Sequence, residues 1–269
     1  MNATIRKGII AAVTMAAAAT IPTMVNADNA RDARCPTTCR QWGWSTAARG
    51  WCRGDTFGVG IDYRVQNGKL YGVGNLGGIY TLSTRSGDGT KVGQLTVALQ
   101  GTRFGVDFNP AANRLRVISD TGQNLRHNID DPAAPTTTTV DGTLTYPPAT
   151  TPATRVTGAA YTNNDLDPNT ATTLFDLDTM LDQIAIQSPA NSGSLAATGK
   201  LGVNASANAG FDIYSTVRGG TTVDLEGYAV MWADGRMGLF EINLLSGKAT
   251  SAGEFPKKVT DIAIPLNQR

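Results

Sequence analysis

The sequence predicts an all-β fold, a β-propeller with five blades of four antiparallel strands. Three observations predict it: a unit of short strands that recurs four times, glycine turns between those strands, and an unaccompanied strand near the C-terminal end. The opening glycines of the four units, Gly60, Gly105, Gly158 and Gly210, lie 45, 53 and 52 residues apart. This period is typical of propeller blades, which bury their faces by stacking on one another.

Each unit contains the same elements in the same order. The first strand is an apolar run after a small residue, as in "GIDYRV" and "GVDFNP". The second strands are "KLYGVG", "RLRVIS", "TLFDLD" and "YAVMWA", and the third strands are "GIYTLS", "NLRHNI", "QIAIQS" and "GLFEIN". Each unit closes on a glycine two residues before a large apolar residue, at Gly93, Gly142, Gly199 and Gly253. Asn67-Gly68, Ser86-Gly87, Asp234-Gly235 and Ser246-Gly247 supply the positive φ that hairpin turns need.

The fifth blade is predicted from the two ends of the chain. "VTDIAIP", Val259 to Pro265, resembles a first strand with no blade behind it, and we expect strands from the N-terminal segment to join it. An open or six-bladed arrangement is the alternative. The predicted repeat domain covers residues 57–266.

The segment 28–56 does not show the expected strands. It holds all three cysteines, Cys35, Cys39 and Cys52, and three of the four tryptophans. One interpretation is an irregular cap with one disulfide and one odd cysteine, as an exported protein can carry. The other is that these codons are out of frame, since Cys, Trp and Arg enrichment is what a wrong frame of a GC-rich gene gives.

The N-terminus predicts export. Arg6 and Lys7 precede an apolar run, and small residues favour cleavage after Ala27, so residues 1–27 are a predicted signal peptide. A retained anchor is the alternative. Cleavage leaves 242 of the 269 residues, and we expect them to be secreted, with the periplasm as the other destination.

Composition excludes some partners. Without Arg6 and Lys7 the chain has 21 basic and 22 acidic residues, which gives no electrostatic reason to expect nucleic acid. No later segment is apolar enough to cross a membrane, and we expect a monomer.

The central motifs are similar to those of a known family. "FGVDFNPAANRLRVISDTGQNLRHN", "VDGTLTY", "GAAYTNN", "TTLFDLD" and "GFDIYS" resemble the exported bacterial domain of unknown function 4394, from about Gly60 to Pro265. The resemblance implies a propeller-like, exported protein and no assigned activity. Members of that family usually have strand-forming sequence where Arg31 to Arg53 stands here, so this chain departs from the family in the segment expected to close the ring.

Two common chemical motifs are not supported, and we predict no catalytic residue. Gly72, Gly74 and Gly77 match G-x-G-x-x-G, but a strand follows them where a dinucleotide site needs a helix. His127, the sole histidine, falls inside a predicted strand, without a serine elbow or the further ligands of a zinc site.

The segment "RVISDTGQNLRHNID" is the best candidate for a binding site. Its turn lies at the end of the blade where blades are connected, and loops from several blades of a propeller converge at such a rim. Neutral amides beside an arginine and a carboxylate suit hydroxyl-rich ligands. The candidate binding residues are Asp120, Thr121, Gln123, Asn124, Arg126, Asn163 and Asn164. The alternative is that these groups only satisfy one another within the scaffold.

We predict no cofactor, with one weak calcium candidate. Asn163, Asp165 and Asp167 stand at alternate positions, as in calcium loops, but the glycine and bidentate glutamate of such loops are missing. A solvated asparagine-rich loop is the other interpretation.

Three functional hypotheses follow. The first is an exported, non-catalytic binding module for a small molecule, a glycan or an extracellular protein. The second is a propeller hydrolase or lyase acting on a carbohydrate or lactone, using Asp62, Asp107 and Asp212 of the first strands. Because these aspartates recur from unit to unit, a structural role is favoured for them. The third is a structural protein of the envelope or matrix.

Overall fold

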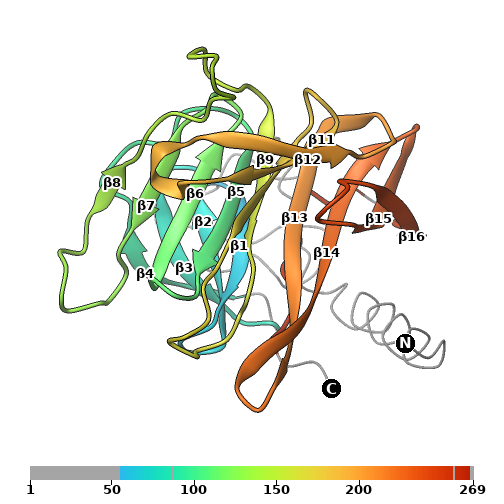
Figure 1. Ribbon diagram of the computed structural model, residues 1–269. Coiled ribbons are helices and arrows are strands. Elements are labelled where there is room, and N and C mark those ends of the chain that lie inside the picture. Colours follow the sequence, from blue (N-terminus) through green and yellow to red (C-terminus); the bar gives the residue numbers. More distant parts are fainter. Residues whose placement is uncertain (1–54, 86–87, 257, 267–269) are drawn as a thin grey trace.

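The chain forms an all-β antiparallel propeller of four blades (Figure 1). The computed structural model describes residues 55–85, 88–256 and 258–266. Each blade is a four-stranded sheet in which neighbouring strands are consecutive in sequence. The strands are β1 (Gly58–Arg64), β2 (Lys69–Gly74), β3 (Gly78–Leu82) and β4 (Gly89–Gln94) in blade 1; β5 (Phe104–Asn109), β6 (Arg114–Ser119), β7 (Asn124–His127) and β8 (Thr138–Val140) in blade 2; β9 (Val156–Tyr161), β10 (Leu174–Asp178), β11 (Gln183–Gln187) and β12 (Leu195–Lys200) in blade 3; and β13 (Ala205–Arg218), β14 (Thr221–Ala233), β15 (Arg236–Ile242) and β16 (Ala249–Glu254) in blade 4.

The four predicted units correspond to the four blades. The glycine that opens each unit lies in the first strand of its blade, and successive first strands pack side by side. This packing explains the glycines: a Cβ on Gly105 would lie 2.6 Å from the backbone nitrogen of Ala159, and one on Gly158 would lie 2.8 Å from Cβ of Phe211. A larger residue would therefore push neighbouring blades apart.

The predicted turns adopt the conformations that their residues favour. Gly68, Gly235 and Gly247 have φ of 64°, 81° and 72°, a region that glycine enters without steric cost. Asp234 also has a positive φ of 50°, as both central residues of a type I′ hairpin require. The predicted Ser86-Gly87 turn lies outside the described residues.

The core lies between blades. Phe108, Leu115 and Leu125 of blade 2 pack against Val73 and Ile79 of blade 1. Blades 3 and 4 share a larger apolar cluster that includes Leu177, Phe211 and Met231. Burial of each such side chain contributes about 1.5–3 kcal/mol, so stacking of the blades is the main source of stability.

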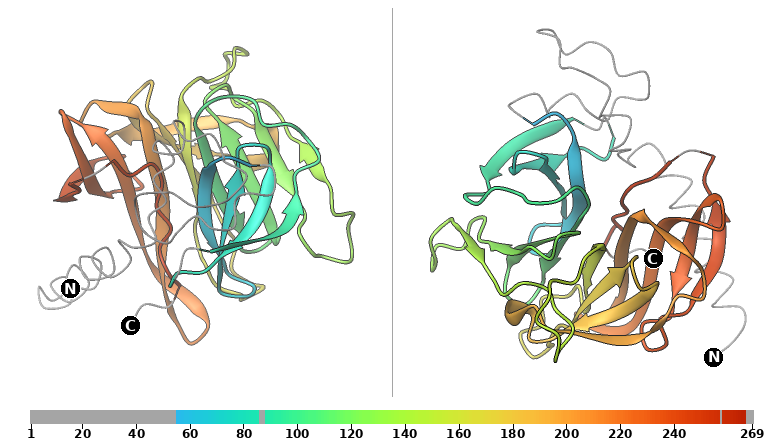
Figure 2. Two further views of the ribbon diagram at one scale, coloured as in Figure 1. Left: turned by 180° about the vertical axis from the view of Figure 1, so that it is seen from behind. Right: turned by 90° about the horizontal axis from the view of Figure 1, so that it is seen from above.

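The prediction of five blades is not supported. Residues 258–266 form no strand, and the segment 28–56, which was to supply the missing strands, lies almost entirely outside the described residues. The C-terminal segment nevertheless lies between blade 4 and blade 1. The backbone N–H of Ile264 donates to Asp212 of β13, and the N–H of Ile61 of β1 donates to Asp261. The view from above shows the four blades following one another in the order of the sequence (Figure 2).

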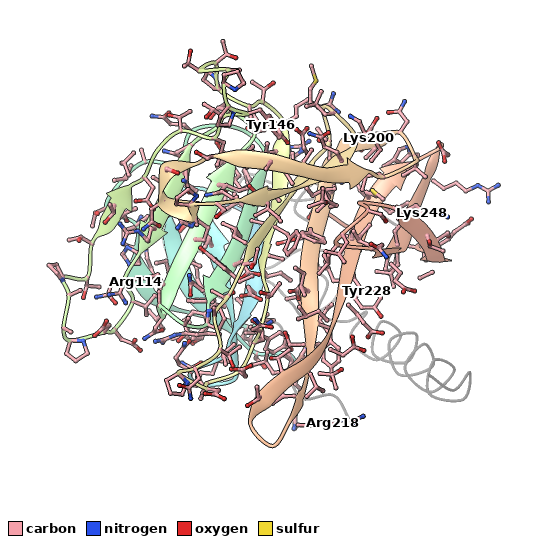
Figure 3. The ribbon with its side chains drawn as sticks, viewed as in Figure 1. Arg114, Tyr146, Lys200, Arg218, Tyr228 and Lys248 are labelled. Carbon is pink, nitrogen blue, oxygen red and sulfur yellow. The ribbon has the colours of Figure 1, made fainter. Side chains whose placement is uncertain are left out.

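The propeller has two faces that carry different turns. The upper face, at the top of Figure 1, carries the turns between second and third strands, at 75–77, 120–123, 179–182 and 234–235. The lower face carries the connections between first and second strands, including the β13–β14 hairpin that ends near Arg218 (Figure 3). Within the described ranges, no helix has the length and apolar character to cross a membrane.

Candidate functional site

Three first strands each place an aspartate at the centre of the ring. Asp62 of β1, Asp107 of β5 and Asp212 of β13 are at most 5% exposed. Each offers one carboxylate oxygen, and these three oxygens lie within 4.8 Å of one another. Oxygen ligands at such spacing are of the kind that a hard cation takes.

Asp62 and Asp107 each join their blade to the next one, and Asp212 joins blade 4 to the C-terminal segment. Asp62 accepts a hydrogen bond from the backbone N–H of Phe108 at 2.8 Å. Asp107 accepts one from the N–H of Tyr161 at 3.3 Å, and Asp212 accepts one from the N–H of Ile264 at 2.6 Å.

A fourth carboxylate closes the ring. Asp261 accepts from the N–H of Ile61 of β1 at 2.8 Å. Blade 3 has Ala160 at the corresponding place in "GAAYTN", so the junction between blades 3 and 4 has no such carboxylate.

Burial sets the protonation of this cluster. It raises the pKa of Asp62 well above 3.8, and the negative charge of Asp212 raises it further. Burial likewise raises the pKa of Asp107 and Asp261, and it raises the pKa of Asp212 to about 6. Because the carboxylates are buried and bonded to backbone N–H groups, they are not presented to a substrate, and the geometry supports a structural role.

Part of the predicted rim site fixes the connection between blades 1 and 2. Asp120 accepts hydrogen bonds from the backbone N–H and the hydroxyl of Thr102, at 2.8 and 2.6 Å. Gln123 accepts from the N–H of Gln100 and donates to the carbonyl of Ala98, both at 2.9 Å. The structure therefore commits both side chains to internal contacts.

The hydroxyl of the neighbouring Thr121, although that residue is exposed, bonds to the carbonyl of Gln100 at 3.2 Å. This contact holds the same connection.

Asn124 and Arg126 point into the interface between blades 2 and 3. Arg116, which the sequence analysis did not single out, organises this region: its Nη1 donates to Asn124 and to Asp141, each at 2.7 Å. Arg126 donates to the same Asp141 at 2.9 Å. Further donors of Arg116 reach the hydroxyl of Tyr161 and the side chain of Asn191.

The structure does not bring Asn163 and Asn164 to the upper face. They follow the end of β9, whereas the 120–123 turn lies near its start, where the N–H of Arg155 donates to the carbonyl of Asp120. The N–H of Asn164 donates to Ser215 of β13 at 2.9 Å. The predicted binding residues are therefore divided between the two faces.

The carboxylates of the calcium candidate, the 163–167 loop, accept hydrogen bonds from blade 4. Asp165 accepts from the N–H and hydroxyl of Thr222, at 2.9 and 2.6 Å, and Asp167 accepts from the hydroxyl of Thr221 at 2.7 Å. Asn163 donates to a backbone carbonyl of the same loop. These contacts pin the loop to the β13–β14 hairpin.

The two motifs rejected on sequence lie as expected. Gly72 and Gly74 belong to β2, and Gly77 is in the turn before β3. His127 is 1% exposed in β7, its Nδ1 lies 2.9 Å from the hydroxyl of Thr138, and burial lowers its pKa.

The upper face exposes large apolar side chains from three blades. Leu76 of blade 1 is 63% exposed, Met180 and Leu181 of blade 3 are 55% and 45% exposed, and Trp232 of blade 4 is 44% exposed. The first three belong to turns, and Trp232 stands two residues before the 234–235 turn.

Comparison with protein families identifies the chain. Residues 36–263 match the family model of a domain of unknown function, DUF4394. The chain belongs to this family. The DUF4394 assignment agrees with the resemblance of the central motifs, and it carries no activity. No match was found among curated proteins.

The structural comparisons are distant. An auxiliary nutrient binding protein from Bacteroides thetaiotaomicron is 14% identical with a TM-score of 0.38, over 77% of this chain and 43% of that one. A protein of unknown function from the same organism is 15% identical with a TM-score of 0.41, over 77% of this chain and 54% of that one. The DUF4394 chain thus spans about half the length of these structures.

Proposed function

We propose that this DUF4394 protein is an exported, non-catalytic binding domain that docks an extracellular protein on its upper face. The observation that carries the proposal is the exposure of Leu76, Met180, Leu181 and Trp232 on that face. Large apolar side chains that remain exposed on turns favour a protein partner, because tryptophan, methionine and leucine contribute buried area at interfaces.

The remainder of the upper face supports the same function. Thr121 is exposed in the 120–123 turn, so a polar group accompanies the apolar ones. A polar rim around apolar anchors is the usual anatomy of a protein interface. The central aspartates support a non-catalytic role, because their oxygens already accept backbone hydrogen bonds.

A glycan is the second candidate ligand, favoured by Trp232. An exposed indole ring offers an apolar face with one N–H donor, which suits a ring that carries both C–H groups and hydroxyls. The affinity for a glycan would depend on Trp232 alone, whereas the affinity for a protein partner would also depend on the apolar residues of blades 1 and 3.

The test compares the two faces. Wild type and variants are used to retain partners from an envelope fraction, and each retained partner is purified and its affinity measured by calorimetry. We expect Trp232→Ala and Met180→Ser each to weaken binding at least tenfold. Leu166→Ser and Val223→Ser on the lower face, where the residues are 63% and 57% exposed, are the matched controls and keep the affinity.

Two outcomes refute or replace the proposal. An equal loss of affinity in the upper-face and lower-face variants refutes docking on the upper face. Binding of an oligosaccharide that Trp232→Ala abolishes and Met180→Ser leaves unchanged selects the glycan instead.

A further inference from the structure

The interface between blades 2 and 3 contains a buried carboxylate without a hydrogen-bond partner. Asp176 of β10 is 0% exposed, and neither of its oxygens has a partner. Buried polar side chains almost always have one, and an unpaired buried carboxylate is among the most unfavourable groups that a protein can hold. The position therefore points to a ligand.

The strands beside Asp176 offer it no donor side chain. Its cross-strand neighbours are Ala159 of β9 and Ala185 of β11, whose methyl groups cannot donate. Arg116 of blade 2 attracts Asp176 electrostatically, but four of its five N–H groups are used in hydrogen bonds to other residues.

A second unpaired acceptor lies on the same face of blade 3. Gln187 of β11 pairs with Leu174 of β10. Leu174 stands two residues before Asp176 on that strand, so Gln187 is a diagonal neighbour of Asp176. Long side chains reach across such a diagonal. Gln187 is 2% exposed, its Nε2 donates to the carbonyl of Ala190, and its Oε1 has no partner.

The charge of Asp176 depends on its surroundings. Burial raises the pKa of Asp176 well above its ordinary value, and the positive charge of Arg116 opposes that rise. Three unpaired oxygens, two from a carboxylate and one from an amide, are ligands that hard cations prefer.

We propose that blades 2 and 3 hold a monovalent metal cation between them, with Asp176 and Gln187 as its protein ligands. The cation satisfies the unpaired oxygens, and its single positive charge matches that of one ionised carboxylate. This site is separate from the central aspartates and from the 163–167 loop, and it does not depend on the binding function of the upper face.

The test measures thermal unfolding of the full chain at constant ionic strength. Sodium or potassium chloride replaces tetramethylammonium chloride stepwise, so that screening by salt stays constant. A cation that binds the native state alone raises the unfolding temperature. We expect a saturable rise of several degrees for wild type with sodium or potassium, absent in Asp176→Asn and reduced in Gln187→Met.

Controls separate this site from the other carboxylates. Gln183→Met removes a buried glutamine from the same strand, and Asp107→Asn and Asp165→Asn remove a carboxylate from the central cluster and from the lower-face loop. All three keep the cation-dependent rise. The proposal is overturned if wild type shows no rise, if Asp176→Asn keeps it, or if Asp107→Asn or Asp165→Asn abolishes it. If Asp176→Asn does not fold, the size of the cation-dependent rise in Gln187→Met decides the question: a reduced rise supports the site, and an unchanged rise overturns it.

Discussion

The central aspartates predict that this protein loses stability as the pH rises from 4 to 7. Asp212 has a pKa of about 6 in the folded chain, against an ordinary value of 3.8. The folded state therefore binds a proton more tightly than the unfolded state does. The stabilisation that protonated Asp212 gives to the folded state is complete below pH 4 and is lost as the pH rises through 6. A difference of about 2 pKa units corresponds to about 3 kcal/mol of unfolding free energy.

Asp212→Asn isolates this contribution. Asparagine cannot ionise, so the unfolding free energy of the variant should fall by about 3 kcal/mol less than that of wild type between pH 4 and pH 7. The variant also loses an acceptor for a backbone N–H, which lowers its stability by about 1–3 kcal/mol at every pH. The difference between the two slopes is therefore the informative quantity.

Urea unfolding followed by circular dichroism at half-unit steps of pH measures both slopes. Asp234→Asn changes an exposed carboxyl group in a surface turn and serves as the control, with the slope of wild type. The reasoning is refuted if Asp212→Asn has the same slope as wild type, or if the stability of wild type rises between pH 4 and pH 7.

Three further predictions concern the contacts between blades. Arg116→Met leaves buried acceptors unpaired and should cost about 3–5 kcal/mol of unfolding free energy, against about 1 kcal/mol or less for the more exposed Arg126→Met, both by urea unfolding. Gly105→Ala places a Cβ against the next first strand, and a lowered unfolding temperature by calorimetry should follow. Asp261→Ala removes the contact that closes the ring, and amide exchange of Ile61 should become faster than in wild type.

Each of these predictions has a result that contradicts it. Equal losses for the two arginine variants would mean that Arg116 is no more important than a surface charge. An unchanged unfolding temperature for the glycine variant would mean that the first strands separate easily. Unchanged exchange at Ile61 would mean that Asp261 does not hold the ring closed.

The repeat architecture could be predicted because each blade repeats the same local requirements. The opening glycines and the turn glycines, such as Gly105 and Gly235, meet steric conditions that are set within one blade or between neighbouring blades. Blade number could not be predicted in the same way. It depends on which segments pair at the ring closure, and "VTDIAIP" has the pattern of a strand while forming none.

The candidate site was harder to predict, because it depends on contacts between blades. Alternation along β6 and β7 places Arg116 and Arg126 on one face, but it does not show that Asp141 joins them. Asn124 and Asn163 belong to one predicted rim site, but a loop after a first strand lies on the face opposite to a turn after a second strand. The chemistry of Asp176 was missed for the same reason: its lack of a partner exists only in three dimensions.

Because blade 3 has Ala160 where the other first strands have aspartate, the junctions between blades respond differently to pH and to temperature. Three carboxylates of first strands accept hydrogen bonds from the neighbouring segment, and Asp261 closes the ring. The first strands of blades 3 and 4 have no such carboxylate between them, and these blades are joined by apolar packing and by the 163–167 loop on the lower face. Hydrophobic contacts weaken on cooling, whereas carboxylate contacts respond to pH. A rise in pH from 4 to 7 should therefore weaken the other junctions first and leave blades 3 and 4 as a coupled pair, and cold should act most strongly on that pair. The same ring would open at different places under the two stresses.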